Sequence, residues 1–312
     1  MNNHYDALSI SSVLINILTA QNNPGIIAGV YKKTVNFAIG DYLITITDVK
    51  QRNLPYGLLC DFSEIDLQQV LKVGDAVDID SEKLCVRNRF FEISLNTASI
   101  WSPEFYMPIH AGDIPFIQRN ITRLEQLIIQ ENNQDGLVPL CRYLPNLMNS
   151  DSCVINESSN LIEKACKALR LIIKAMRNFD EDLLIKEFIL LTGLGIGLTP
   201  SGDDILMGLM ATMTITSQAA QKKWILSILN KLLPQIKELT TDVSSNFHKA
   251  ISQGYYPERF SNLISKIISA KNPDAVQPAF EDMLKWGHTS GYEIILGMII
   301  GLSLSIENLE GS

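Results

Sequence analysis

The spacing of hydrophobic residues changes along the 312-residue chain, and this change limits the folds that the chain can adopt. Between residues 25 and 100, β-branched and aromatic residues form short runs separated by polar or Gly-Asp turns, a pattern typical of strands. After residue 155, apolar residues recur every three or four positions, as in amphipathic helices. The sequence therefore predicts an α+β protein, in which an N-terminal antiparallel β-rich domain precedes a C-terminal, mainly α-helical domain.

Individual elements can be placed from the same patterns. A helix is expected over residues 10–18, because apolar residues share one helical face there and the segment NNPG at 22–25 would end it. The predicted strands are residues 26–31, 34–39, 42–49, 76–79 and 84–95. A helix over residues 117–130 follows a segment punctuated by Pro and Gly. We therefore predict a first domain at residues 1–115 and a second at 116–312.

Charge and composition argue against several kinds of partner. The net charge is −8, and no cluster of Lys and Arg is interleaved with aromatic residues, so a nucleic-acid partner is not expected. The N-terminus lacks the basic and then apolar pattern of a signal peptide. The most apolar run, residues 294–306, is too short to span a bilayer and predicts a core helix. We expect a cytoplasmic protein without a membrane partner.

The first motif that suggests chemistry is GLGIGLTPSGDD, at residues 193–204. Its alternate glycines allow positive φ and a close approach of the backbone to a ligand. Ser201 is expected to be the N-cap of the next helix with Asp204 at its third position, and such a helix start favours an anion. The motif is not a Walker A loop, because no Lys follows, nor a dinucleotide fingerprint, because Pro200 interrupts it.

Two adjacent carboxylates, Asp203 and Asp204, complicate this anion site because they would repel a phosphate. They could hold Mg²⁺ together with several waters, or accept hydrogen bonds from an amide or ureido NH₂ group. A purely structural interpretation is that both residues only cap their helix.

The second motif is GHTSGYE, at residues 287–293, and it also precedes a helix. Ser290 and Glu293 have the spacing of a capping box. His288 is the only imidazole in either motif, although a lone His in a loop between helices is commonly structural. Small residues follow in both helices, and they are Gly208, Ala211, Gly297 and Gly301. We therefore expect the two helices to pack closely, with both N-termini at one pocket. His248, elsewhere in the helical half, is interpreted as a partly buried surface residue.

Together, GLGIGLTPSGDDILMG and WGHTSGYEIILG resemble the family described as a subunit of bacterial oxamate carbamoyltransferase. The resemblance is strong over the two motifs and looser over the rest of the chain. It implies phosphorolysis of oxalurate to oxamate and carbamoyl phosphate in allantoin breakdown, a part of purine degradation. It also implies two further subunits, one of them similar to acyl-CoA synthetases. The Ser-Thr-Arg-Thr-Arg and His-Pro-x-Gln elements of ordinary transcarbamoylases are absent from this sequence.

Our leading hypothesis is a carbamoyltransferase subunit that is active only with its partners. The loop at 193–201 would bind the carboxylate or phosphate end of a ureido ligand or carbamoyl phosphate. Thr289 and Ser290 would take a second anionic group, and His288 would be a proton donor or phosphate ligand. The candidate catalytic residues are Asp203, Asp204 and His288. The candidate substrate-binding residues are Gly195, Gly197, Thr199, Ser201, Gly202, Thr289, Ser290 and Gly291.

The roles of the two aspartates are expected to differ, because successive helix residues point about 100° apart. Asp203 is predicted to contact the ligand and Asp204 to cap the helix start at Ser201. No tightly bound cofactor is expected, and Mg²⁺ held by Asp203 and Asp204 would bind weakly. The alternatives are a non-catalytic subunit for metabolite binding or assembly, and an ATP-dependent phosphotransferase.

Overall fold

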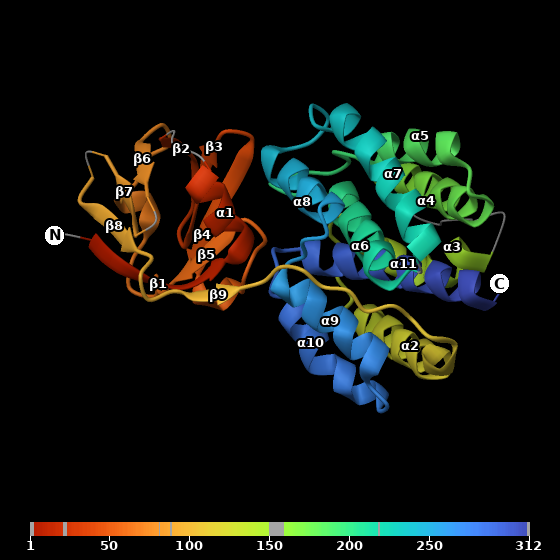
Figure 1. Ribbon diagram of the computed structural model, residues 1–312. Coiled ribbons are helices and arrows are strands. Elements are labelled where there is room, and N and C mark those ends of the chain that lie inside the picture. The colour runs from red at the N-terminus through yellow and green to blue at the C-terminus, as the bar shows by residue number, and fades with distance from the viewer. Residues whose placement is uncertain are drawn as a thin grey trace. The chain divides into compact units, whose positions relative to one another are not determined.

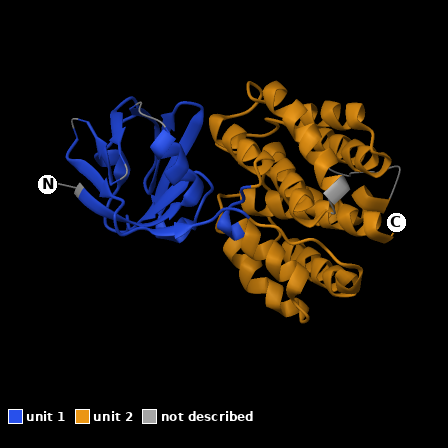
Figure 2. Cartoon of the chain, in the orientation of Figure 1, with its two compact units in different colours: residues 1–104, 255–259 blue, residues 105–254, 260–312 orange. Residues whose placement is uncertain are grey.

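The computed structural model describes residues 3–20, 24–80, 82–87, 89–149, 159–217 and 219–310. The chain divides into two compact units, shown in Figure 2. The first comprises residues 1–104 and 255–259, and the second comprises residues 105–254 and 260–312. The first unit is rich in strands and the second is helical (Figure 1), which confirms the predicted α+β class.

The first unit is a β-barrel. Its strands are β1 (Asn3–Ser11), β2 (Gly25–Val30), β3 (Thr34–Ile39), β4 (Tyr42–Asp48), β5 (Gly57–Cys60), β6 (Ala76–Ile79), β7 (Lys83–Val86), β8 (Phe91–Ser94) and β9 (Ser99–Trp101). The strand order is β5-β4-β3-β2-β6-β7-β8-β1-β9, and an additional pairing of β1 with β5 closes the barrel. Most neighbouring strands are antiparallel, but β1 runs parallel to β8 and β9, and β4 runs parallel to β5.

Local patterns explain most of these strands. In β3, the alternate side chains of Val35, Phe37 and Ile39 are buried in the core, as the two-residue period of a strand requires. The single strand expected over residues 84–95 is instead the antiparallel pair β7 and β8. The sequence patterns also missed β1, β5 and β9. Because β1 extends to Ser11, the following helix α1 (Ser12–Ala20) begins later than expected.

The second unit is built from α-helices. They are α2 (Ile114–Gln130), α3 (Leu144–Asn149), α4 (Asn160–Asn178), α5 (Glu181–Leu191), α6 (Ser201–Thr216), α7 (Ala219–Ile236), α8 (Asp242–Ser252), most of α9 (Glu258–Ser269), α10 (Gln277–Met283) and α11 (Ser290–Glu310). Helices α6 and α11 lie side by side in the interior of this unit (Figure 1). Every residue of α6 is buried, which explains why its sequence has no polar face.

Glycines bring α6 and α11 into close contact. A Cβ atom at Gly208 would overlap the carbonyl oxygen of Ile294, and a Cβ atom at Gly297 would overlap that of Ile205. Only glycine therefore allows the two backbones to approach this closely. The close packing predicted from the small residues is confirmed.

The two helices run in the same direction. Their starts are joined by Thr199 and Ser290, whose hydroxyl oxygens are 3.1 Å apart. Towards their other ends, the hydroxyl oxygens of Thr216 and Ser305 are 2.9 Å apart. Both N-termini consequently lie at the same end of the pair, and the orphan N–H groups of two helix starts are brought together.

Helix α11 is long and apolar enough to cross a membrane by length and composition alone. However, 78% of its most apolar window is buried within the chain. A helix that is hydrophobic on all sides and covered by its own protein is a core helix, as the sequence predicted for residues 294–306.

Candidate functional site

The two sequence motifs meet in the structure. Thr199 lies two residues before the start of α6, and Ser290 is the first residue of α11. Their hydroxyl groups are hydrogen bonded although 91 positions separate them. The predicted convergence of the two loops is confirmed.

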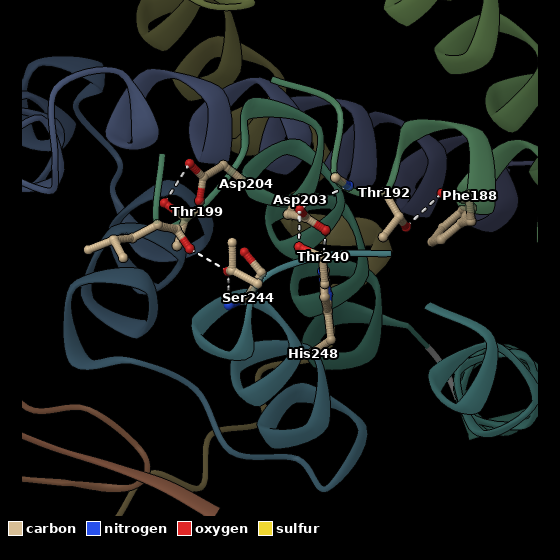
Figure 3. Close-up of polar contacts among 11 residues, drawn as sticks. Phe188, Thr192, Thr199, Asp203, Asp204, Thr240, Ser244 and His248 are labelled. Carbon is tan, nitrogen blue, oxygen red and sulfur yellow. Dashed lines mark hydrogen bonds and ion pairs between the residues drawn. The ribbon is translucent and has the colours of Figure 1, made fainter. Parts of the chain in front are cut away.

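Asp204 is the carboxyl group closest to this junction. Its Oδ2 accepts a hydrogen bond from the hydroxyl of Thr199 over 3.1 Å (Figure 3), and the hydroxyl of Ser290 lies beside the same carboxyl. Burial raises the pKa of Asp204 well above its usual value, and the negative charge of Glu293 raises it further. The expected capping arrangement is wrong, because the N-cap is Pro200, which makes no side-chain capping hydrogen bond.

Glu293 is a second buried carboxyl group, at the corresponding place in α11. Its side chain has no exposed surface. It accepts hydrogen bonds from the N–H of Leu137 (2.8 Å) and the hydroxyl of Thr289 (3.0 Å), and the hydroxyl of Ser201 lies beside it. Burial raises the pKa of Glu293. The sequence pattern indicated only a capping box at Glu293, so its place in the site was missed.

The two helix starts exchange partners. The hydroxyl of Ser290 in α11 lies beside the carboxyl of Asp204 in α6, and the hydroxyl of Ser201 in α6 lies beside the carboxyl of Glu293 in α11. The two close glycine contacts described above are related in the same way. Gly208 of α6 lies against Ile294 of α11, and Gly297 of α11 lies against Ile205 of α6. The aligned sequences SGDDILMG and SGYEIILG, at 201–208 and 290–297, are the signal that could have identified Glu293 as the counterpart of Asp204. We call this set of six residues the carboxyl–hydroxyl cluster; it consists of Thr199, Ser201, Asp204, Thr289, Ser290 and Glu293.

A third segment, which the sequence analysis did not include, covers the cluster. A Cβ atom at Gly136 would overlap Oε1 of Glu293 and lie 2.9 Å from Oγ of Ser201, and Gly136 has a φ of 57°. The neighbouring Asp135 binds Nε2 of His288 over 2.8 Å. The His288 side chain is 81% exposed, so this candidate catalytic residue lies on the outside of the cluster.

Asp203 has different partners from its neighbour Asp204. Its carboxyl accepts hydrogen bonds from the N–H of Gly193 (3.0 Å) and the hydroxyl of Thr240 (2.7 Å), and it lies 3.1 Å from Nε2 of His248 (Figure 3). Asp203 and His248 are both buried. The interpretation of His248 as a partly buried surface residue is therefore wrong, because its ring forms a buried pair with Asp203. Asp203 holds the glycine loop against α8.

The glycine loop between α5 and α6 has the backbone that the sequence suggested. Gly195 and Gly197 have φ values of 119° and 110°, which favour glycine. Between them, Ile196 is 93% exposed. In contrast, Gly202 and Gly291 are packing positions, since a Cβ atom at either one would overlap a backbone oxygen of the preceding segment.

Among the residues that the structure describes, no positive side chain compensates the two carboxyl groups of the cluster. Within the described part of the chain, no Lys, Arg or His forms an ion pair with Asp204 or Glu293. The same residues contain no group of three or more His, Cys, Asp and Glu side chains that could hold a metal ion. The weak Mg²⁺ site expected at Asp203 and Asp204 stays a prediction, although their side chains point to different partners.

Comparison with known protein families covers most of the chain. The model described as "Oxamate carbamoyltransferase subunit AllH" matches residues 191–302, which include both motifs, the helices α6 and α8, and the first part of α11. The model described as "AllH family N-terminal domain" matches residues 6–100, which include most of the barrel. No solved structure matches the chain.

Proposed function

The chain belongs to the family of the oxamate carbamoyltransferase subunit AllH, and from this premise we propose that it forms the ureido-acid site of a carbamoyl-transferring complex. The reaction is the phosphorolysis of oxalurate, or of a related ureido acid, in allantoin breakdown. A phosphate oxygen attacks the ureido carbonyl carbon, and the bond from that carbon to the substituted nitrogen breaks. The proton of the phosphate ends on the leaving nitrogen, so that oxamate and carbamoyl phosphate are formed.

The observation that carries this proposal is the junction of the two motifs at Thr199 and Ser290. It brings an exposed glycine loop with positive φ values beside two buried carboxyl groups. The loop offers backbone N–H groups to an anion, whereas the cluster offers acceptors to the N–H groups of a ureido ligand. These are the two kinds of group that a ureido acid presents. The effect on the reaction is positioning of the reactants.

Within this site, we assign Asp204 to the ligand and Asp203 to the protein. This reverses the assignment made from the sequence. Asp203 already has the N–H of Gly193, the hydroxyl of Thr240 and His248 as partners, and it lies away from the junction of the motifs. Asp204 lies at the junction itself. His288, exposed at the edge of the cluster, remains a candidate phosphate ligand or proton donor.

The proposed site needs positive charge from elsewhere. Neither motif contains Lys or Arg, and phosphate sites commonly use these residues or Mg²⁺. We propose that one of the two further subunits, or a Mg²⁺ ion carried by the substrate, supplies it. Catalysis therefore requires the assembled complex.

The test is reconstitution. The chain is expressed alone and together with its two partner subunits, and carbamoyl phosphate formed from oxalurate and phosphate is measured. The assembled complex should be active, and Asp204→Asn should reduce its turnover at least about tenfold, as for a lost hydrogen bond to a charged group. Asp242→Asn is the matched control, because Asp242 is also in the first turn of a helix but is exposed. Full activity of the Asp204→Asn complex would favour the alternative of a non-catalytic subunit.

A further inference from the structure

We propose that the carboxyl–hydroxyl cluster recognises the N–H groups of an amide or ureido ligand and does not hold the ligand's anionic end. This inference rests on the proposed function and specifies it, because it fixes which way round the ligand binds. It also changes the role of Thr289 and Ser290, which the sequence analysis assigned to an anionic group.

The hydroxyl protons of the cluster are already used within it. A Ser or Thr hydroxyl has one proton to donate and two lone pairs that accept. Thr289 donates to Glu293 over 3.0 Å, and Thr199 donates to Asp204 over 3.1 Å. Because the proton of Thr199 is used in this way, Ser290 is the donor in the 3.1 Å contact between the hydroxyls of Thr199 and Ser290. These three hydroxyls therefore offer only lone pairs to a ligand, and the fourth, Ser201, lies beside the carboxyl of Glu293.

The charge of the cluster also disfavours an anionic group. Asp204 and Glu293 are both buried, and neither has a cationic partner among the described side chains. A ligand carboxylate or phosphate placed here would add a further negative charge to an uncompensated pair, which is strongly unfavourable in a buried site. A proton held by one of the carboxyls would add a single donor, against four hydroxyl acceptors. An NH₂ group carries two donors and no charge, so it suits the cluster.

Donors for an anion are available next to the cluster. The backbone N–H groups of Gly195, Ile196 and Gly197 donate to no other residue of the described chain. Ile196 and Gly197 are exposed, and Gly195 is partly exposed. Free N–H groups in a loop with positive φ values form an anion-binding concavity. The ligand's carboxylate or phosphate is therefore placed at Gly195–Gly197, and its N–H end at the cluster.

Oxamate and oxalate provide the probe. They share a two-carbon skeleton with a carboxylate at one end, but the other end is an amide NH₂ in oxamate and a second carboxylate in oxalate. A site built to accept from an N–H rejects a ligand that lacks it, because its buried acceptors stay unpaired. We expect the full-length chain, alone or in its complex, to bind oxamate at least about tenfold more tightly than oxalate, as for hydrogen bonds to charged groups.

The test is calorimetric titration of both ligands at pH 8 with matched variants. Asp204→Asn and Glu293→Gln replace an acceptor oxygen with an NH₂ donor, so the preference for oxamate should fall at least about fivefold in each. Asp242→Asn should keep it. If the two carboxyl variants do not fold, Thr199→Val and Thr199→Ser serve instead. Valine removes an acceptor and should lower the preference, whereas serine keeps the hydroxyl and should preserve it.

The outcomes separate this inference from the proposed function. Oxamate and oxalate binding with equal affinity to the wild-type protein would overturn the inference and leave the proposed function standing. A preference for oxamate over oxalate that is unchanged in Asp204→Asn, Glu293→Gln and Thr199→Val would also overturn the inference. Absence of binding of oxalurate, oxamate and oxalate, both to the chain and to its complex, would overturn the proposed function itself.

Discussion

The hydroxyl oxygens of Thr199 and Ser290 lie 3.1 Å apart and join two loops that are 91 positions apart in the sequence. This contact exists because α6 and α11 pack in parallel through glycines, so that both helix starts are at one end. Close packing of two buried helices thereby determines the geometry of the polar groups at their tips.

The glycine contact between α6 and α11 should be essential for stability. Gly208→Ala should lower the free energy of unfolding by about 1–3 kcal/mol, as overpacking of a core does, because the new methyl group would overlap the carbonyl oxygen of Ile294. Gly112→Ala is the control, since a Cβ atom there meets nothing within 4 Å. Urea denaturation measures both variants. A Gly208→Ala protein as stable as the control would show that the helices are further apart than described.

Asp203 should be more important for stability than for ligand contact. Asp203→Asn replaces one oxygen with an NH₂ group, which cannot accept from all of Gly193, Thr240 and His248. We expect the free energy of unfolding to fall by about 1–3 kcal/mol, the cost of an unsatisfied buried group. Thermal denaturation of Asp203→Asn and Asp242→Asn provides the comparison. An unchanged melting temperature with lost ligand binding would instead support the original assignment of Asp203 to the ligand.

The pH dependence of stability should reveal the buried carboxyl pair. Burial raises the folded-state pKa values of Asp204 and Glu293 above the ordinary values of 3.8 and 4.5, so the folded protein binds these protons more tightly than the unfolded chain. Their contribution to stability is fully present below the unfolded pKa values and is lost as pH rises through the folded ones.

As pH rises from 5 to 8, the free energy of unfolding of Asp204→Asn should therefore fall less than that of the wild-type protein. The difference is about 1.4 kcal/mol for each unit of pKa change within that interval. Groups that titrate in both proteins cancel in the comparison. Parallel curves of unfolding free energy against pH would contradict the raised pKa of Asp204.

The loop at Gly136 should be required for the integrity of the cluster. Gly136→Ala places a methyl group against Oε1 of Glu293, so oxamate affinity should fall at least about tenfold, as expected when a buried hydrogen-bonded group is displaced. Gly254→Ala is the matched control, because Gly254 also has positive φ but its Cβ position is open. If both variants bind oxamate equally well, this loop does not support the site.

Mg²⁺ should bind weakly in the absence of ligand. The neighbouring carboxylates of Asp203 and Asp204 have separate sets of protein partners, and Mg²⁺ usually takes one or two carboxylates together with substrate oxygens. Calorimetric titration of the ligand-free chain with MgCl₂ should show little heat. A tight site of one ion per chain would contradict this expectation and assign the metal to the protein.

The sequence by itself determined the features that depend on nearest neighbours. The alternation in β3, the helix α2 near residues 117–130 and the two glycine-flanked helix starts follow from local spacing and backbone preference. The small residues in α6 and α11 also predicted their close packing, because only a missing side chain allows two backbones to approach.

Tertiary structure alone decided which groups these elements face. The barrel is closed by β1, whose pairing with β5 and β8 depends on distant strands. The carboxyl of Glu293 binds Leu137, 156 positions away, and Asp204 rather than Asp203 faces the junction of the motifs. Adjacent side chains on a helix diverge by about 100°, so only the packing of α6 against α8 and α11 determines which aspartate braces the loop and which lies beside the ligand site.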